Sequence, residues 1–155
     1  MKKSVYLDTT IPSYYYDKRS ELKYPCEITR KWWKEERRNY DIFISFETIA
    51  ELNRGNYPRK EEILEFVNAI EQLDQSRDIK NIVEHYIKNT LMPKDVRGDA
   101  VHLAYASYYK IDFLLTWNCN HLANANKKQH IKIINSQLDL FTPEIITPLE
   151  LFTEK

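Results

Sequence analysis

Four short apolar stretches of this chain carry side-chain oxygen atoms that could bind a cation. They are residues 5–9, 48–52, 99–104 and 114–118, and they contain Asp8, Glu51, Asp99 and Asn118. Carboxylates gathered in one pocket repel one another unless a hard divalent cation neutralises them. If the fold brings these stretches together, the chemistry that they favour is metal-dependent.

The hydrophobic pattern predicts the elements that must position these residues. Continuous apolar runs predict short buried strands at 4–7, 41–45, 113–116 and 131–134, and a proline-bounded edge strand at 141–148. Apolar residues at helical spacing predict helices at 11–16, 26–40, 46–53, 59–73, 78–90 and 96–109. Candidate helix caps precede several of them, at Thr9, Thr10, Ser45 and Asp95.

Strands that alternate with helices predict an α/β fold in which helices cover a parallel sheet. In such sheets, ligands bind outside the carboxyl ends of the strands. Asp8, Ser45 and residues 116–118 all lie where a predicted strand ends. Glu51 lies on the helix that Ser45 begins, and Asp99 lies in the first turn of the helix at 96–109. The topology therefore predicts that the oxygen-bearing residues meet at one edge of the sheet.

Composition limits the other possibilities. A chain of 155 residues suits a single domain, 1–155, and its 30% charged and 43% hydrophobic residues are typical of a globular protein. No apolar run approaches the roughly 20 residues of a membrane-spanning helix, and Asp8 interrupts the only possible start of a signal peptide. We therefore expect a cytoplasmic protein without a membrane partner. The 23 basic and 23 acidic residues balance, so net charge gives no support for a nucleic-acid partner.

Taken together, the motifs resemble a known family. They are Tyr-Leu-Asp-Thr-Thr-Ile-Pro-Ser-Tyr at 6–14, Ile-Ala-Glu-Leu at 49–52, Asp-Ala-Val-His-Leu-Ala-Tyr-Ala at 99–106 and Leu-Leu-Thr-Trp-Asn at 114–118. In this order and spacing, the chain resembles PIN-domain ribonucleases, and among them the VapC-like toxins of bacterial type II toxin–antitoxin systems. The resemblance extends over nearly the whole chain. It implies a PIN-like three-layer α/β/α fold with a short central parallel sheet.

The resemblance also implies a function. Asp8, Glu51 and Asp99 fall at the three acidic positions of the family, where they would hold Mg²⁺ or Mn²⁺ and hydrolyse phosphodiester bonds of single-stranded RNA. Asn118 stands where family members commonly carry an aspartate, so one charge is missing from the expected catalytic set. An asparagine attracts a second cation less strongly than a carboxylate does. A homodimer and an antitoxin protein that covers the acidic pocket are further implications.

Candidate substrate contacts surround these acids. Thr9 and Thr116 could orient a metal-bound water or touch the substrate through their hydroxyl groups. Arg54 and Arg59 follow the helix of Glu51 and could bind phosphate groups. A tyrosine among residues 14–16 could stack on an unpaired base. Other candidate phosphate ligands form the basic face of the helix at 26–40: Arg30, Lys31, Lys34, Arg37 and Arg38.

Each candidate also has a purely structural interpretation. Asp8 could cap the helix that begins near Ile11, and Asp99 could complement a helix N-terminus. Glu51 could be a solvated surface acid, in which case Glu47, one turn earlier, is the reserve candidate. His102 lies three residues after Asp99 and could reach a metal, but a hydrogen-bonded core histidine is the commoner case, so we leave it out of the catalytic set.

Two other functions remain open from the sequence. The replacement at Asn118 motivates a PIN-like domain that has weakened catalysis and binds RNA or protein. A metal-dependent nuclease or phosphatase that acts on other phosphate esters, including DNA, would use the same acidic residues.

Overall fold

A five-stranded sheet forms the centre of the computed structural model, which describes residues 1–92 and 97–154. Its strands are β1 (Lys3–Leu7), β2 (Tyr40–Ile44), β3 (Glu71–Gln72), β4 (Phe113–Leu115) and β5 (Glu144–Ile146). They follow the order β3-β2-β1-β4-β5, and every neighbouring pair is parallel. The central position of β1 places the end of this strand, and therefore Asp8, at the middle of the carboxyl edge.

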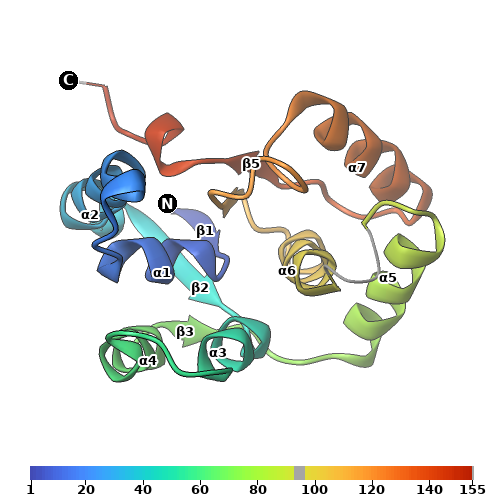
Figure 1. Cartoon of the computed structure of the whole chain (residues 1–155). Coiled ribbons are helices and arrows are strands. Elements are labelled where there is room, and N and C mark those ends of the chain that lie inside the picture. Colours follow the sequence, from blue (N-terminus) through green and yellow to red (C-terminus); the bar gives the residue numbers. More distant parts are fainter. Residues whose placement is uncertain (93–96, 155) are drawn as a thin grey trace.

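Helices cover both faces of this sheet (Figure 1). They are α1 (Thr10–Tyr16), α2 (Lys23–Glu36), α3 (Phe46–Asn53), α4 (Lys60–Asn68), α5 (Arg77–Lys88), α6 (Arg97–Tyr108) and α7 (Ala125–Gln137), with short 3-10 turns η1 (Ser20–Leu22), η2 (Arg37–Asn39) and η4 (Pro148–Glu150). In Figure 1, α5, α6 and α7 lie together on the right of the sheet, and α1 and α2 lie on the left. The fold is mixed α/β with an all-parallel sheet, as the sequence predicts.

Alternating side chains of the strands build two hydrophobic cores. Tyr6 of β1 packs on one face with residues of α5, α6 and α7. Its neighbours Val5 and Leu7 pack on the other face with Trp32 of α2 and Val67 of α4. Full burial of an aliphatic side chain contributes roughly 1.5–3 kcal/mol, so the two cores fix both the strands and the helices that carry the candidate site residues.

The expected strand at 131–134 is wrong, because this segment belongs to α7. Asn124 caps that helix by accepting a hydrogen bond from the backbone N–H of Lys127. Ile131 and Ile134 face the core at helical spacing, whereas Ile133 is 47% exposed. A segment this short, with three isoleucines around Lys132, does not distinguish a buried strand from one side of a helix, and here the cap and the spacing decide for the helix.

The expected helix at 59–73 is also wrong at its end. The helix α4 stops at Asn68, and β3 then pairs with β2 through Glu71 and Gln72. Both residues of β3 are exposed and polar, so no hydrophobic pattern marks this strand.

The remaining helices and strands lie close to their predicted bounds. The helix expected at 26–40 begins three residues earlier, at Lys23, and ends at Glu36. Residues 37–39 form η2, and Tyr40 begins β2. The candidate cap Asp95 lies outside the described residues. Within the described residues, no helix combines the length and the apolar character that crossing a membrane requires.

Candidate active site

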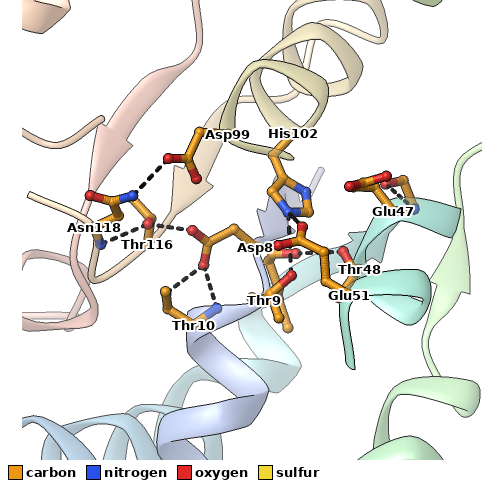
Figure 2. Close-up of polar contacts among 12 residues, drawn as sticks. Asp8, Thr9, Thr10, Glu47, Thr48, Glu51, Asp99, His102, Thr116 and Asn118 are labelled. Atoms are coloured by element: carbon orange, nitrogen blue, oxygen red, sulfur yellow. Dashed lines mark hydrogen bonds and ion pairs between the residues drawn. The ribbon is translucent and has the colours of Figure 1, made fainter. Parts of the chain in front are cut away.

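The carboxyl ends of β1, β2 and β4 bring the candidate residues to one edge of the sheet (Figure 2). Asp8 follows β1, and Thr116 follows β4. Ser45 follows β2 and caps α3 by accepting a hydrogen bond from the backbone N–H of Glu47, and α3 then carries Glu51. The first turn of α6 supplies Asp99.

Asp8 is 2% exposed, and both of its carboxylate oxygens accept hydrogen bonds. Oδ1 accepts from the backbone N–H of Thr10 at 3.0 Å and from the Thr10 hydroxyl, and Oδ2 accepts from the Thr116 hydroxyl. The bond to the Thr10 backbone satisfies the first N–H group of α1, but Asp8 is not the cap that the sequence allowed, because the N-cap position is Thr9 and its side chain makes no capping hydrogen bond.

The two threonines that hold Asp8 are held in turn by the loop after β4. Thr10 Oγ1 accepts a hydrogen bond from the backbone N–H of Trp117, and Thr116 Oγ1 accepts one from the backbone N–H of Asn118, both at 2.9 Å. Thr116 is fully buried, so its hydroxyl fixes Asp8 and does not face a groove that a substrate could enter.

Asn118 presents an N–H group to Asp99. Its Oδ1 accepts from the backbone N–H of His121 at 3.1 Å, and its Nδ2 donates to Asp99 Oδ2 at 2.9 Å. A backbone N–H only donates, so the atom that faces His121 must be the amide oxygen. The oxygen that a metal ion would need is therefore already used inside the loop.

Glu51 forms an ion pair with a buried histidine. His102 is 1% exposed, and its Nε2 lies 2.5 Å from Glu51 Oε1 and 3.3 Å from the Thr9 hydroxyl. Glu47, the reserve candidate, lies one turn away and faces Arg54 at 3.9 Å. Glu51, and not Glu47, therefore contacts His102, which lies one turn after Asp99 in α6.

The site is electrostatically frustrated. Burial, together with the charges of Asp8 and Glu51, raises the pKa of the Asp99 carboxyl from 3.8 to about 6, although the charges of His102 and His121 oppose this change. Burial also raises the pKa of Asp8, against the opposing effects of His102 and the hydrogen bonds from Thr10 and Thr116. The charge of Asp8 thus disfavours the ionised form of Asp99, an effect that a bound divalent cation would offset.

The Glu51–His102 pair behaves differently. Burial alone would raise the pKa of Glu51, but the hydrogen bond and charge of His102 lower it below its ordinary value. Burial would lower the pKa of His102, and the hydrogen bond and charge of Glu51 raise it instead. Both directions indicate that the pair is ionised, so His102 neutralises Glu51 and leaves Asp8 and Asp99 to repel each other.

The donor chemistry suits Mg²⁺ or Mn²⁺, which prefer carboxylate oxygens. Among the described residues, however, no group of three or more His, Cys, Asp or Glu side chains is already arranged to hold a metal ion. The hydrogen bonds above explain this arrangement, because threonine hydroxyls occupy Asp8 and His102 occupies Glu51. An ion bound by all three acids would share Asp8 oxygens that already accept hydrogen bonds.

A groove of about 740 Å³ opens beside Glu51 and Thr9. Arg54 and Arg59 line it together with the aromatic rings of Tyr16 and Tyr57. The guanidinium of Arg59 lies over the ring of Tyr16, 4.9 Å from its centroid, and donates to Glu62. The backbone of Arg59 has a φ of 63°, which is uncommon outside glycine. The predicted substrate contacts Thr9, Arg54 and Arg59 therefore share one groove, which begins at the acidic site.

Part of the basic face expected on the helix at 26–40 lies elsewhere. Lys34 of α2 and Arg37 and Arg38 of η2 line a separate groove with Lys2, next to the residues that begin β1 and β2. This is the amino edge of the sheet, opposite the acidic site. These cations therefore do not surround the candidate active site.

Three residues of the site have no functional interpretation from the sequence alone. Tyr6 and Ser45 hold His102 from behind, through a chain of hydrogen bonds that the sequence does not predict. Gly98 leaves room for Glu51, since a Cβ at this position would lie 3.0 Å from Glu51 Oε1 and 3.1 Å from its Cδ. A buried tyrosine hydroxyl needs a partner, and this is the one sequence signal that could have drawn attention to Tyr6.

The close approach at Gly98 gives a first prediction. We expect Gly98→Ala to displace the Glu51 carboxylate and to weaken Mn²⁺ binding, measured by titration calorimetry. Alanine favours a helix over glycine by up to about 1 kcal/mol, so urea unfolding of the metal-free protein should show little loss of stability. Unchanged Mn²⁺ affinity would show that the space beside Gly98 is irrelevant to the site.

Comparison with known proteins identifies no relative. No protein-family model matches the chain, and no curated protein matches its sequence.

Proposed function

We propose that this chain is a metal-dependent endoribonuclease with a PIN-like three-layer α/β/α fold. The observation that carries the proposal is the placement of Asp8, Glu51 and Asp99 at one edge of a parallel sheet, where burial and mutual repulsion raise the pKa of Asp99 to about 6. Keeping such a carboxylate unneutralised is unfavourable, and sites of this kind are typically functional.

Asp8, Asp99 and Glu51 would hold Mg²⁺ or Mn²⁺. The ion would activate water and stabilise the charge that develops on the phosphodiester oxygens. Thr10 and Thr116 keep Asp8 in one orientation, Asn118 holds one oxygen of Asp99, and His102 holds one oxygen of Glu51. These contacts leave one oxygen of Asp99 and one of Glu51 to the ion, whereas both oxygens of Asp8 already accept hydrogen bonds.

The groove beside Glu51 supports single-stranded RNA as the substrate. Arg54 and Arg59 supply positive charge for phosphate groups, and Tyr16 and Tyr57 supply aromatic rings on which unpaired bases stack. Cations next to an acidic centre attract a substrate that the acidic centre alone would repel.

The biological setting of the proposal comes from the resemblance of the four sequence motifs to VapC-like toxins. By this resemblance, the protein acts in the cytoplasm as a homodimer, and an antitoxin protein restrains it by covering the acidic pocket. The apolar residues Leu52, Pro58 and Ile63, which line the same groove, suit contact with a protein segment.

Cleavage assays test the reaction. We expect Mn²⁺-dependent cleavage of single-stranded RNA that EDTA stops, without comparable cleavage of single-stranded DNA or a small phosphomonoester. Cleavage of DNA, or hydrolysis of the phosphomonoester, would instead support a different metal-dependent phosphoesterase. RNA cleavage that persists in EDTA would contradict the proposal.

A second candidate function is an RNA- or protein-binding module with weakened catalysis. The observation that favours it is the N–H group that Asn118 turns toward Asp99, where a carboxylate would strengthen a cation site. Tight binding of RNA without cleavage at any Mn²⁺ concentration would decide for this second function.

A further inference from the structure

A buried chain of hydrogen bonds ends on Glu51. The Tyr6 hydroxyl lies 2.6 Å from Ser45 Oγ and 2.6 Å from His102 Nδ1, and His102 Nε2 lies 2.5 Å from Glu51 Oε1. Ser45 and Tyr6 are fully buried. The chain therefore starts in the protein interior and reaches the solvent side at Glu51 and, through a longer contact of 3.3 Å from His102 Nε2, at Thr9.

The direction of the last hydrogen bond follows from the chemistry of the groups. An ionised carboxylate only accepts, so His102 Nε2 must carry the proton in this contact. On the other side of the charged imidazole, Nδ1 also carries a proton and donates to the Tyr6 hydroxyl, which can in turn donate to Ser45 Oγ. Both ring nitrogens of His102 are therefore donors in this chain.

The chain connects the three elements that form the site. Tyr6 comes from β1, Ser45 and Glu51 come from the beginning and the end of α3, and His102 comes from α6. The phenol of Tyr6 and the imidazole of His102 also pack together, with ring centroids 5.5 Å apart. Packing and hydrogen bonding thus leave His102 a single orientation.

A buried polar chain is an unfavourable way to fill a core, because apolar residues of similar volume are often at least as stabilising. The rest of this core is apolar around Tyr6 and includes Leu103, Ala104 and Leu114. The polar chain therefore calls for a role other than stability, and its shortest contact with the candidate metal ligands is the one to the carboxylate of Glu51.

We infer that His102 is a positioning residue that holds Glu51 Oε1 and so directs the other oxygen of Glu51 toward the metal ion, with Tyr6 and Ser45 fixing the imidazole from behind. This inference deepens the proposed function and rests on it. Groups that orient a metal ligand typically change metal affinity 10- to 100-fold when they are removed.

Two replacements of the same histidine test the inference. The amide nitrogen of glutamine can reach the position of Nε2, whereas that of asparagine reaches only the position of Nδ1. We expect His102→Asn to weaken Mn²⁺ binding about 10- to 100-fold and His102→Gln to retain most of the affinity, in calorimetric titrations of the full chain. Urea unfolding without metal should show similar losses of stability for both variants, so that fold damage does not explain the difference.

A metal-free measurement separates this inference from the proposed function. In EDTA, nitrogen-15 NMR of the imidazole groups should show a His102 Nε2–H protected from exchange, and Glu51→Gln should shift this signal strongly. If wild-type protein binds no Mn²⁺ but the signal responds to Glu51→Gln, the proposed function fails and the contact to Glu51 stands. Equal loss of Mn²⁺ affinity in the two His102 variants, or an Nε2–H signal that ignores Glu51→Gln, would overturn the inference.

Discussion

Asp99→Asn should abolish RNA cleavage while making the metal-free protein more stable. The carboxylate contributes charge to the metal site, and losing several kcal/mol of transition-state stabilisation slows a reaction by roughly 10³-fold. The variant keeps the shape of the side chain, and its amide oxygen can still accept the hydrogen bond from Asn118. Initial rates of RNA cleavage with saturating Mn²⁺ measure the first effect.

The expected gain in stability follows from the raised pKa of Asp99. Since this pKa is about 6 in the folded protein and near 3.8 without the surrounding structure, the folded state binds more protons between these values. Its stability therefore falls as the pH rises from about 4 to about 6. Each pH unit amounts to about 1.4 kcal/mol, so with allowance for partial solvent exposure we expect a gain of roughly 1 to 3 kcal/mol in Asp99→Asn near neutral pH.

The pH dependence of that gain is its control. In urea titrations with EDTA, the difference between Asp99→Asn and wild type should reach its full size as the pH rises above about 6 and should vanish only below pH 3.8, where Asp99 is protonated in both states. An active variant would reject Asp99 as a metal ligand. If Asp99→Asn and wild type were equally stable at neutral pH, the charge of Asp99 would not destabilise the folded protein.

Asp99 is a sharper test than Asp8 because Asp8 has two roles. Its oxygens accept bonds from Thr10 and Thr116, which connect the start of α1 to the loop after β4. A structural role of Asp8 at the start of α1 is therefore compatible with a functional role in the site. Loss of activity on replacing Asp8 would not separate a missing metal ligand from a displaced loop.

The sequence predicts the elements that carry the site better than those around it. The strand before Asp8, the cap at Ser45 and the helix of Glu51 are confirmed, because each shows a clear pattern over a short distance. The segment 131–134 and the short strand β3 lack such a pattern. The apolar residues of 131–134 form one face of a helix, and over four positions such a face resembles a strand. The two residues of β3 are polar, and they form a strand only because they pair with β2.

The hydrogen bonds inside the site lie beyond sequence reasoning. The spacing of Asp99 and His102 places both on one side of a helix, but it does not show that His102 contacts Glu51, which is 51 positions earlier. Likewise, the sequence allows the oxygen of Asn118 to face a metal ion. Only the backbone N–H of His121 reveals that this oxygen is turned away. The first fact depends on a contact between distant segments, and the second depends on the conformation of one short loop, which residue types alone do not fix.

Asn118→Asp is expected to strengthen the metal site. The new carboxylate would keep the hydrogen bond from the His121 backbone and would replace the N–H that now lies 2.9 Å from Asp99. Two carboxylates this close repel each other without a cation and bind one together. We expect Mn²⁺ affinity to rise about tenfold or more, which corresponds to about 1.4 kcal/mol, and the metal-free protein to lose stability.

The matched control is Asn120→Asp, which adds the same charge to an exposed position of the same loop. Long-range attraction should give this control only a small, salt-sensitive gain in affinity, because exposed charges are screened within about 10 Å at 0.1 M salt. Calorimetric Mn²⁺ titrations of both variants at two salt concentrations separate the effects. Equal gains in the two variants would remove Asn118 from the site. If Asn118→Asp alone binds Mn²⁺ and cleaves RNA while wild type does neither, the natural asparagine is what turns this acidic site into a binding module.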